Sequence, residues 1–571
     1  MAGSSGMAER AASINHFIPS GFKSRGSESR LGAGFHLDRR ALSRAGLATL
    51  SDYWTQSEKR ERGKRGEAMN NFDKKRLLES IANIAPRLPN AENESNDESL
   101  FLKKIMPVPD YRIALERDCL LVLGGRGVGK TELFRLLANQ TGRQTLVKNL
   151  NIRGLPPLEE TIWIAGFGLT GQQGKNLPSP DTVENQMKDA DGIDWQAFWI
   201  GLMLGALLGE KSRKLNLYWV DKIPEEVQEA LVEERLPLLS DWLPLVRQNL
   251  EKINYALDRF DKELVESDRW LFVIYDELDR ILPLDHQLAA PIRELLAFWL
   301  LSWRHWERIR PKIFLRTDLF REDFLGFPDA SKLRAHEVRL EWDASWLYRL
   351  LVKRLANSGA EMRDYLEELV PNLISDSDSP LGWLASADES RLESAINKMI
   401  GKFMGNSPIQ GYVYSWIPNH LQDTQSRITP RTFLRLFSLA AERRLEHFDP
   451  TALAGSQLLK PSDLQEALIK TSDDRIQELA QEAYPWLEAL KTSLKGFNLP
   501  IAEATFLEAL QNTEWSELPG QQPPSSKPAE VLEYLLQLGI VEISMDRRVN
   551  MPKIYMYGFG LTRRGGRKRR K

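Results

Sequence analysis

The sequence has 571 residues, of which 42% are hydrophobic and 27% are charged, close to the averages for globular proteins. A chain of this length usually folds into more than one domain. The 77 Lys and Arg residues nearly balance the 79 Asp and Glu residues, and the formal net charge of −2 excludes a generic binder of polyanions. The single cysteine, Cys119, excludes a disulfide within the chain and a cysteine-based metal cluster.

Residues 1–70 predict a flexible basic N-terminal arm. Within residues 1–66 there are 12 Lys and Arg against 6 Asp and Glu, and apolar residues are sparse. The arm is either a solvated tail or a segment that binds a partner. The first residues lack the apolar core of a secretory signal, and the most apolar run, 198–209, is too short to span a bilayer. We therefore expect a cytoplasmic protein without membrane contact, in which this run is a buried helix.

Strands that alternate with helices predict an α/β core over residues 71–342. A first helix is expected at 72–88. Continuous apolar runs are typical of buried parallel strands. They occur at 118–124, 161–168, 269–275, 312–315 and 336–340, with helices at 131–139 and 292–306. Residues 169–193 are typical of a loop, and we interpret about 169–262 as a helical insertion after the second strand.

The rest of the chain reads as mainly helical. We expect a helical lid over residues 343–450, and a winged-helix-like domain over 451–562. The latter rests on a helix at 529–538 and on two alternating segments, 541–545 and 553–557, which predict a hairpin. The last nine residues, 563–571, include seven Lys and Arg and form a basic tail. Next to a winged helix, such a tail is a candidate DNA contact; a solvated tail and a protein-docking module are the alternatives.

Residues 124–131, GGRGVGKT, match the phosphate-binding pattern G-x-x-x-x-G-K-[ST]. The glycines let backbone N–H groups point at phosphate oxygens, and the following helix presents its N-terminus to the same anion. We expect Lys130 to contact the β- and γ-phosphates and the Thr131 hydroxyl to bind Mg²⁺. The motif follows an apolar strand and opens a helix, which argues against a chance match. The predicted nucleotide-binding residues here are Gly124, Gly125, Arg126, Gly127, Val128, Gly129, Lys130, Thr131 and Glu132.

The strand LFVIYDE, residues 271–277, ends in two acids. A parallel strand would carry both carboxylates to the sheet edge where the phosphate loop lies. We expect Asp276 to hold Mg²⁺ and Glu277 to polarise the attacking water. The alternative is a strand that simply ends in a charged turn.

Two arginines are candidates for sensing the γ-phosphate. The strand KIFLRTD, residues 312–318, ends in polar residues, and Arg316 is the first candidate, with Thr317 next; the alternative is an ordinary charged strand end. Arg431 follows Thr429 and Pro430 at the start of a helix, from which it could reach the phosphates. It could equally be a solvated residue behind a proline at the first helical position. Catalytic roles are thus assigned to Lys130, Glu277 and Arg316.

Together, the phosphate loop, LFVIYDE, KIFLRTD and the TPR helix resemble P-loop ATPases of the AAA+ and STAND groups, in the ASCE division. The runs IWIAGFG, KIFLRTDLF and YMYGFGLTRRG are similar to bacterial ATPases that are often linked to phage-defence loci. The resemblance covers about residues 100–445. It implies a five-stranded parallel sheet in the order 5-1-4-3-2, a helical lid, and ATP with Mg²⁺ as cofactors. It assigns no arginine finger, for which Arg280 and Arg321 are only candidates.

Three functions follow as hypotheses. The first is an ATPase switch in which ATP closes the lid and hydrolysis by Glu277 resets it. The second is a nucleotide-gated binding module or scaffold with little turnover, and the third is a DNA-associated regulator. No nuclease, protease or deaminase residue set is visible, so in a defence system the effector activity would belong to a partner protein. A homo-oligomer is a further expected assembly.

Overall fold

The computed structural model describes residues 73–85, 97–150, 152, 154–168, 176–209, 218–283, 287–320, 326, 330–518 and 520–563. All of the described residues belong to one compact unit. The basic arm predicted for residues 1–70 and all but the first residue of the basic tail lie outside the described residues. No helix within the described ranges has the length and apolar character that a membrane span requires.

A five-stranded sheet organises the N-terminal half of the chain, and its strand order is β2-β3-β4-β1-β5. All four neighbouring pairs are parallel. Read from the other edge, the order is 5-1-4-3-2, so the prediction for the sheet is confirmed. The strands are β1 (Leu121–Gly124), β2 (Thr161–Phe167), β3 (Trp270–Tyr275), β4 (Ile309–Arg316) and β5 (Glu337–Arg339).

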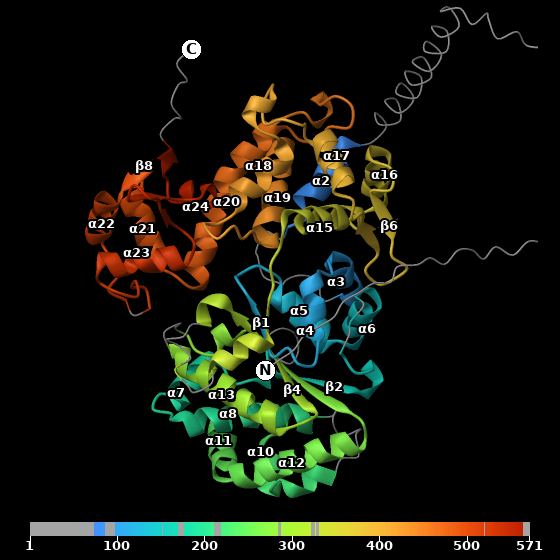
Figure 1. Ribbon diagram of the computed structural model, residues 1–571, viewed down its shortest axis with the longest axis vertical. Coiled ribbons are helices and arrows are strands. Elements are labelled where there is room, and N and C mark those ends of the chain that lie inside the picture. Colours follow the sequence, from blue (N-terminus) through green and yellow to red (C-terminus); the bar gives the residue numbers. More distant parts are fainter. Residues whose placement is uncertain are drawn as a thin grey trace, which may run out of the picture. The chain divides into compact units, whose positions relative to one another are not determined.

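The two faces of the sheet belong to two different hydrophobic cores. Side chains alternate along a strand. Accordingly, Val122 packs in one core with residues of α5 (Lys130–Ala138) and α6 (Gln140–Asn149). Its neighbours Leu121 and Leu123 pack in the other core, with helices from the segment between β2 and β3. The sheet is therefore the middle layer of three, with helices on both sides (Figure 1).

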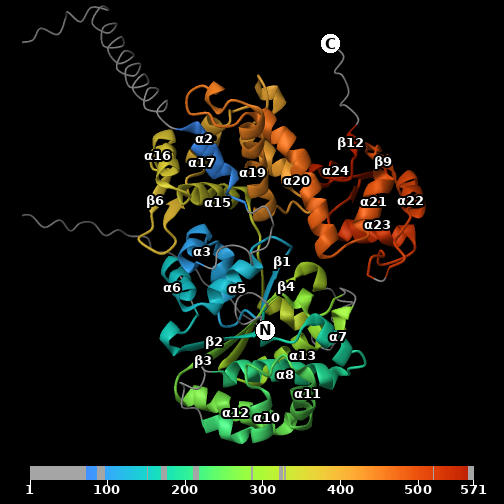
Figure 2. The ribbon, with the colours of Figure 1, turned by 180° about the vertical axis from the view of Figure 1, so that it is seen from behind.

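Helices fill the segment between β2 and β3, where an insertion is predicted. The most apolar of them, α8, is buried along most of its length, as expected for residues 198–209. A further helix, α13, follows β3, and in both views these helices gather on one side of the sheet, opposite α5 and α6 (Figures 1 and 2). Their bounds are α7 (Pro180–Gln186), α8 (Gly192–Leu208), η4 (Tyr218–Lys222), α10 (Glu225–Ala230), α11 (Leu239–Gln248), α12 (Leu250–Glu266) and α13 (Ala289–His305).

Aromatic side chains of this layer pack directly behind β3. The Tyr275 ring lies 5.9 Å from that of Trp199 in α8 and 6.0 Å from that of Trp299 in α13, both edge to face. On the neighbouring strand, a Cβ added to Gly166 would come within 2.5 Å of the Tyr275 ring. Glycine at this position therefore makes room for the tyrosine. The end of β3, where the acidic pair follows, has a rigid aromatic support.

Short helices before β1, and the helices that follow β5, complete the middle of the chain. Three precede β1: α2 (Lys74–Ala82), α3 (Glu98–Lys104) and α4 (Pro109–Leu115). After β5 come mainly helices, as predicted, with one two-stranded antiparallel hairpin, β6–β7. The elements of this region are α15 (Ala344–Ala356), α16 (Ala360–Leu369), β6 (Ile374–Asp376), β7 (Trp383–Ala385), α17 (Glu389–Met399), α18 (Val413–Leu421) and α19 (Pro430–His447).

The C-terminal region contains a winged helix. A long helix, α20 (Pro461–Glu482), leads into it. Helix α21, strand β9, helices α22 and α23 and strands β10 and β11 then follow in chain order, and the three strands form an antiparallel sheet in the order β10-β11-β9. This order of elements is that of a winged helix, so the prediction is confirmed. The bounds are α21 (Leu487–Leu494), β8 (Asn498–Leu499), β9 (Ile501–Ala502), α22 (Glu503–Gln511), α23 (Pro528–Gln537), β10 (Glu542–Ile543), β11 (Arg548–Asn550), α24 (Lys553–Met556) and β12 (Thr562–Arg563).

Two local predictions are wrong. The segment 553–557, expected as the second strand of the hairpin, is helix α24, and β11 takes the place of that strand. Ile554 to Met556 are buried in succession, which a half-exposed strand does not allow. The segment 169–193, expected as a loop, contains α7, whose N-terminus is capped by Ser179 with Pro180 at the first position. The same Ser-Pro sequence that is typical of a loop is also a helix start signal.

Candidate functional site

The phosphate loop joins β1 to α5. The strand ends at Gly124 and the helix begins at Lys130. Gly127 and Gly129 have φ values of 76° and 101°, a region that L side chains rarely adopt, so the tight turn depends on glycine at both positions. A Cβ added to Gly127 would lie 3.3 Å from Cβ of Arg431, which places the start of α19 against this loop.

Lys130, the first residue of α5, directs its side chain back to the start of the loop. Its Nζ donates to the carbonyl oxygens of Gly124 and Gly125, each at 3.0 Å. Burial lowers the pKa of Lys130 to about 8, and the nearby carboxylate of Asp276 opposes that shift. An ammonium held beside the glycine-rich loop is suited to bind a phosphate group, for which it would exchange these two carbonyl contacts.

Asp276 directly follows β3 and lies beside the loop. The side chain is 2% exposed, and it forms a hydrogen bond with the Thr131 hydroxyl. Burial raises the pKa of Asp276 to about 6, against the opposing effects of Lys130 and Thr131. Its Oδ2 is buried with no hydrogen-bond partner among the described residues. A hydroxyl and an adjacent, unsatisfied carboxylate oxygen are ligands that suit Mg²⁺, so these two residues fit the predicted metal site.

Glu277 has an unusual backbone conformation. Its φ is 56°, in the left-handed region, which costs a residue with a side chain about 1–3 kcal/mol and is often found at functional sites. The conformation turns the chain sharply after β3, so that Glu277 and Asp276 do not alternate as in a strand. The Glu277 side chain is 7% exposed and pairs with Arg280 at 3.1 Å. Arg280, a candidate arginine finger, thus contacts the catalytic candidate of its own chain, and Arg321 lies outside the described residues.

Arg316 ends β4 at the level of Gly124 in the parallel register. Its guanidinium is 3% exposed and binds two carboxylates. It contacts both oxygens of Asp318, through Nε at 3.1 Å and through Nη2, and it contacts Asp279 through Nη1 at 3.1 Å. Burial would raise the pKa of Asp279, but Arg316, Arg126 and Lys130 together hold it below its usual value. Arg126 of the phosphate loop lies 3.6 Å from the same Asp279 carboxylate.

Arg431 is also held by an acid of the same chain. Its Nη1 donates to Glu478 of α20, which also accepts from Arg475 at 2.9 Å. Burial would raise the pKa of Glu478, but the two arginines hold it below its usual value. The Cβ and Cδ atoms of Arg431 lie against Gly127, while its guanidinium is directed to α20.

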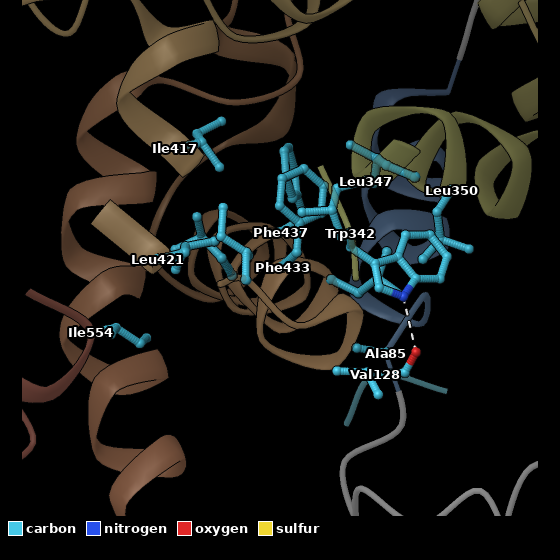
Figure 3. Packing of buried hydrophobic residues seen from close by; sticks show 14 of the residues in the cluster. Ala85, Val128, Trp342, Leu347, Leu350, Ile417, Leu421, Phe433, Phe437 and Ile554 are labelled. Atoms are coloured by element: carbon cyan, nitrogen blue, oxygen red, sulfur yellow. Dashed lines mark hydrogen bonds between the residues drawn. The ribbon is translucent and has the colours of Figure 1, made fainter. Parts of the chain in front are cut away.

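The helices after β5 also contact the phosphate loop. Trp342 donates from its indole Nε1 to the Val128 carbonyl at 2.9 Å, and both residues belong to the core that contains Phe433 and Phe437 of α19 (Figure 3). Glu132, predicted to bind nucleotide, accepts from Arg354 of α15 at 3.3 Å. The loop and the start of α5 are therefore connected to elements that follow β5 in the chain.

A cavity of about 1100 Å³ adjoins the phosphate loop. Gly124, Gly125, Arg126 and Val128 line one side of it. Its other walls come from the start of α4, from residues after β4, from the start of α19, and from the C-terminal region. These residues include Pro109, Asp110, Thr317, Asp318, Trp342, Trp346, Ile428, Thr429, Tyr484, Tyr534 and Leu538. A volume of this size is slightly above the range of about 300–1,000 Å³ that is usual for small-molecule sites, so it is large enough for a nucleotide.

The structure thus brings Lys130, Thr131 and Asp276 together, with Glu277 next to them. It places Arg316 and Arg431 at the edges of the loop but in contact with acids. Sequence reasoning missed Asp279, although it lies two residues after the acidic pair and could have been considered there. It also missed Glu478 and Tyr484, which are far along the chain and carry no motif.

Comparisons with known proteins add little to this geometry. No protein-family model matches the chain, and no curated protein is similar to it. Among solved structures, an Aeropyrum pernix ORC1 protein in complex with DNA is 11% identical, with a TM-score of 0.32; the match covers 81% of this chain and 96% of that one. An Aeropyrum pernix ORC2 protein with ADPNP and ADP is 12% identical, covers 83% and 93% of the two chains, and has a TM-score of 0.25. Structural similarity this low shows neither the family nor the function of this chain.

The fold assignment rests instead on topology. The strand order 5-1-4-3-2, the phosphate loop after β1 and the acidic pair after β3 are the arrangement that the sequence resemblance implies. The chain therefore has the α/β fold of a P-loop NTPase core, followed by a C-terminal winged helix. Neither the comparisons nor the structure supports the bacterial origin and the link to phage defence that the resemblance also implies.

Proposed function

We propose that this protein is a switch that binds MgATP at the phosphate loop, hydrolyses it, and changes the placement of its C-terminal helices accordingly. The observation that carries the proposal is the meeting of Lys130, Thr131 and Asp276 at one sheet edge, with an unsatisfied buried oxygen on Asp276. In this arrangement Lys130 compensates the phosphate charge. Thr131 and Asp276 would hold Mg²⁺, which supplies Lewis-acid stabilisation of the phosphoryl group when bound.

Glu277 is the candidate base in this mechanism. Its buried carboxylate sits next to the metal-binding candidate and can orient a water molecule for attack on the γ-phosphate. Arg316 and Arg431 can compensate the charge that develops on the phosphoryl oxygens. Both are already engaged by carboxylates, so each would have to exchange partners to act on a nucleotide.

Phosphate release by the full chain tests this proposal. Wild type is compared with Lys130→Ala, which should lose binding, and with Glu277→Gln, which should bind ATP but turn it over about 10²–10⁴ times more slowly. Wild-type release no faster than that of Lys130→Ala would exclude hydrolysis. ATP binding without such release would leave the second candidate, a nucleotide-gated binding module, which the engaged states of Arg316, Arg431 and Glu277 favour.

The charges on the winged helix do not favour a role in DNA recognition. The third helix of such a domain, here α23, is the one that usually enters the groove. In this chain α23 carries Glu530 and Glu533, and Glu530 pairs with Lys527 at 2.7 Å. Acids on that helix would repel phosphates. DNA contact by the basic tail, 563–571, and a defence role with a separate effector remain proposals that rest on the sequence alone.

A further inference from the structure

Both arginines that could sense the γ-phosphate contact one short stretch at the end of α20. Glu478 accepts from Arg431 of α19. Tyr484, just beyond the helix, donates its hydroxyl proton to Oδ2 of Asp318, and the same hydroxyl lies 3.4 Å from Nη2 of Arg316. The two arginines belong to different elements, so their shared attachment to residues 478–484 is a specific feature of this chain.

The Tyr484 hydroxyl contacts both members of an ion pair. Asp318 binds the Arg316 guanidinium through both carboxylate oxygens. The Tyr484 hydroxyl donates to Oδ2 of Asp318 and also lies 3.4 Å from Nη2 of Arg316. A group that contacts a carboxylate and its guanidinium together fixes their relative position. Arg316 has to leave or share Asp318 before it can turn to a phosphate, because its guanidinium already binds Asp318 in a bidentate manner.

The winged helix determines where the Tyr484 ring lies. The ring is 6% exposed, and its centroid lies 6.0 Å from that of Tyr534 in α23 and 6.3 Å from that of Trp486. Trp486 in turn packs edge to face on Trp515. Three further rings of the C-terminal domain thus support Tyr484, and a displacement of α23 would displace the tyrosine with it.

We propose that Tyr484 is a positioning residue for Arg316, which it holds against Asp318 until movement of the winged helix withdraws it. The inference rests on the proposed ATPase function. The nucleotide site and the winged helix are then coupled in both directions. A γ-phosphate that attracts Arg316 weakens its contact with Tyr484, and a partner that pulls the winged helix away releases Arg316 for the nucleotide.

The variant Tyr484→Phe tests this, because it removes the hydroxyl and keeps the ring in the aromatic cluster. We expect kcat for phosphate release to rise about fivefold, the factor for one hydrogen bond of ordinary strength, with KM changed by less than about twofold. The matched control is Tyr365→Phe in α16, a buried tyrosine whose hydroxyl donates to the Ser456 carbonyl at 2.7 Å, far from this network in sequence. The control should leave kcat and KM unchanged.

A second measurement does not depend on turnover. In the wild-type full chain, amide hydrogen exchange in α21 and α23 should differ between the complex with ADP and that with a non-hydrolysable ATP analogue. In Tyr484→Phe this difference should disappear, while Tyr365→Phe should retain it. A kcat for Tyr484→Phe that is unchanged or lower, or an exchange difference that persists, overturns the inference. If wild type itself releases no phosphate above Lys130→Ala, the proposed hydrolysis fails, and the exchange result alone decides the role of Tyr484.

Discussion

Replacing Asp276 by Asn should make the nucleotide-free protein more stable. Burial raises the pKa of Asp276 from its ordinary value of 3.8 to about 6. A tenfold change in proton affinity corresponds to about 1.4 kcal/mol, so keeping this carboxylate ionised in the folded protein costs about 3 kcal/mol at neutral pH. Asn removes that cost, in which the favourable attraction to Lys130 is already included. We therefore expect a net gain of about 1–3 kcal/mol in the free energy of unfolding.

The sign of the pH dependence follows from the raised pKa. The unfolded chain ionises Asp276 above about pH 4, whereas the folded chain resists ionisation until about pH 6. The carboxylate therefore destabilises the fold progressively as the pH rises through this window, and the full cost is present above it. The difference between Asp276→Asn and wild type should shrink as the pH falls from about 7.5 toward 4.

Thermal unfolding of the full chain measures this effect, and Asp279→Asn is the matched control. The pKa of Asp279 is held low by Arg316, Arg126 and Lys130 despite its burial, so its charge stabilises the fold. That variant should lose about 1–2 kcal/mol at neutral pH, since the carboxylate is partly exposed. Adding MgATP should raise the unfolding temperature of wild type but not of Asp276→Asn. If both variants are destabilised alike without nucleotide, the reasoning about Asp276 is refuted.

Three other predictions concern the site and its support. Lys130→Ala should weaken ATP binding by about two orders of magnitude, as measured by calorimetry, because it removes a charge-assisted contact to phosphate; binding within about threefold of wild type would contradict this. Trp342→Phe should lower stability by about 1–3 kcal/mol, as measured by thermal unfolding, because the buried Val128 carbonyl loses its donor at 2.9 Å. Gly201→Ala should lower the unfolding temperature while leaving the nucleotide affinity unchanged, because a Cβ there would come within 2.3 Å of the Trp242 ring, remote from the loop; equal stability would contradict the packing.

Most of the core could be predicted because its signals are local. A buried parallel strand is a continuous apolar run, and the phosphate loop is specified by glycines and a lysine within eight positions. The acidic pair follows the apolar run of β3, so the parallel topology alone brings Asp276 to the loop. The positions of Lys130, Thr131 and Asp276 relative to one another follow from these two motifs.

The environment of the arginines could not be predicted, because it depends on contacts between distant parts of the chain. Arg316 meets Tyr484, and Arg431 meets Glu478, through tertiary packing that no sequence period encodes. A strand that ends in Arg is compatible with a free phosphate sensor and with a buried ion pair alike. The strand predicted at 553–557 failed for a related reason, since burial on several sides there favours a short helix over a half-exposed strand.

The aromatic packing behind β3 has a consequence for how tightly Asp276 would bind a cation. Tyr275 is fixed between Trp199 and Trp299 on one side and the small Gly166 on the other, so the next residue cannot move outward to recover water. Lys130 and Thr131 compensate the buried carboxylate only in part, so a bound cation would stabilise it further, which adds to the affinity of the site for that cation. Substitutions in α8 or α13 that loosen this packing should therefore lower metal affinity, even though both helices lie on the opposite side of the sheet from α5.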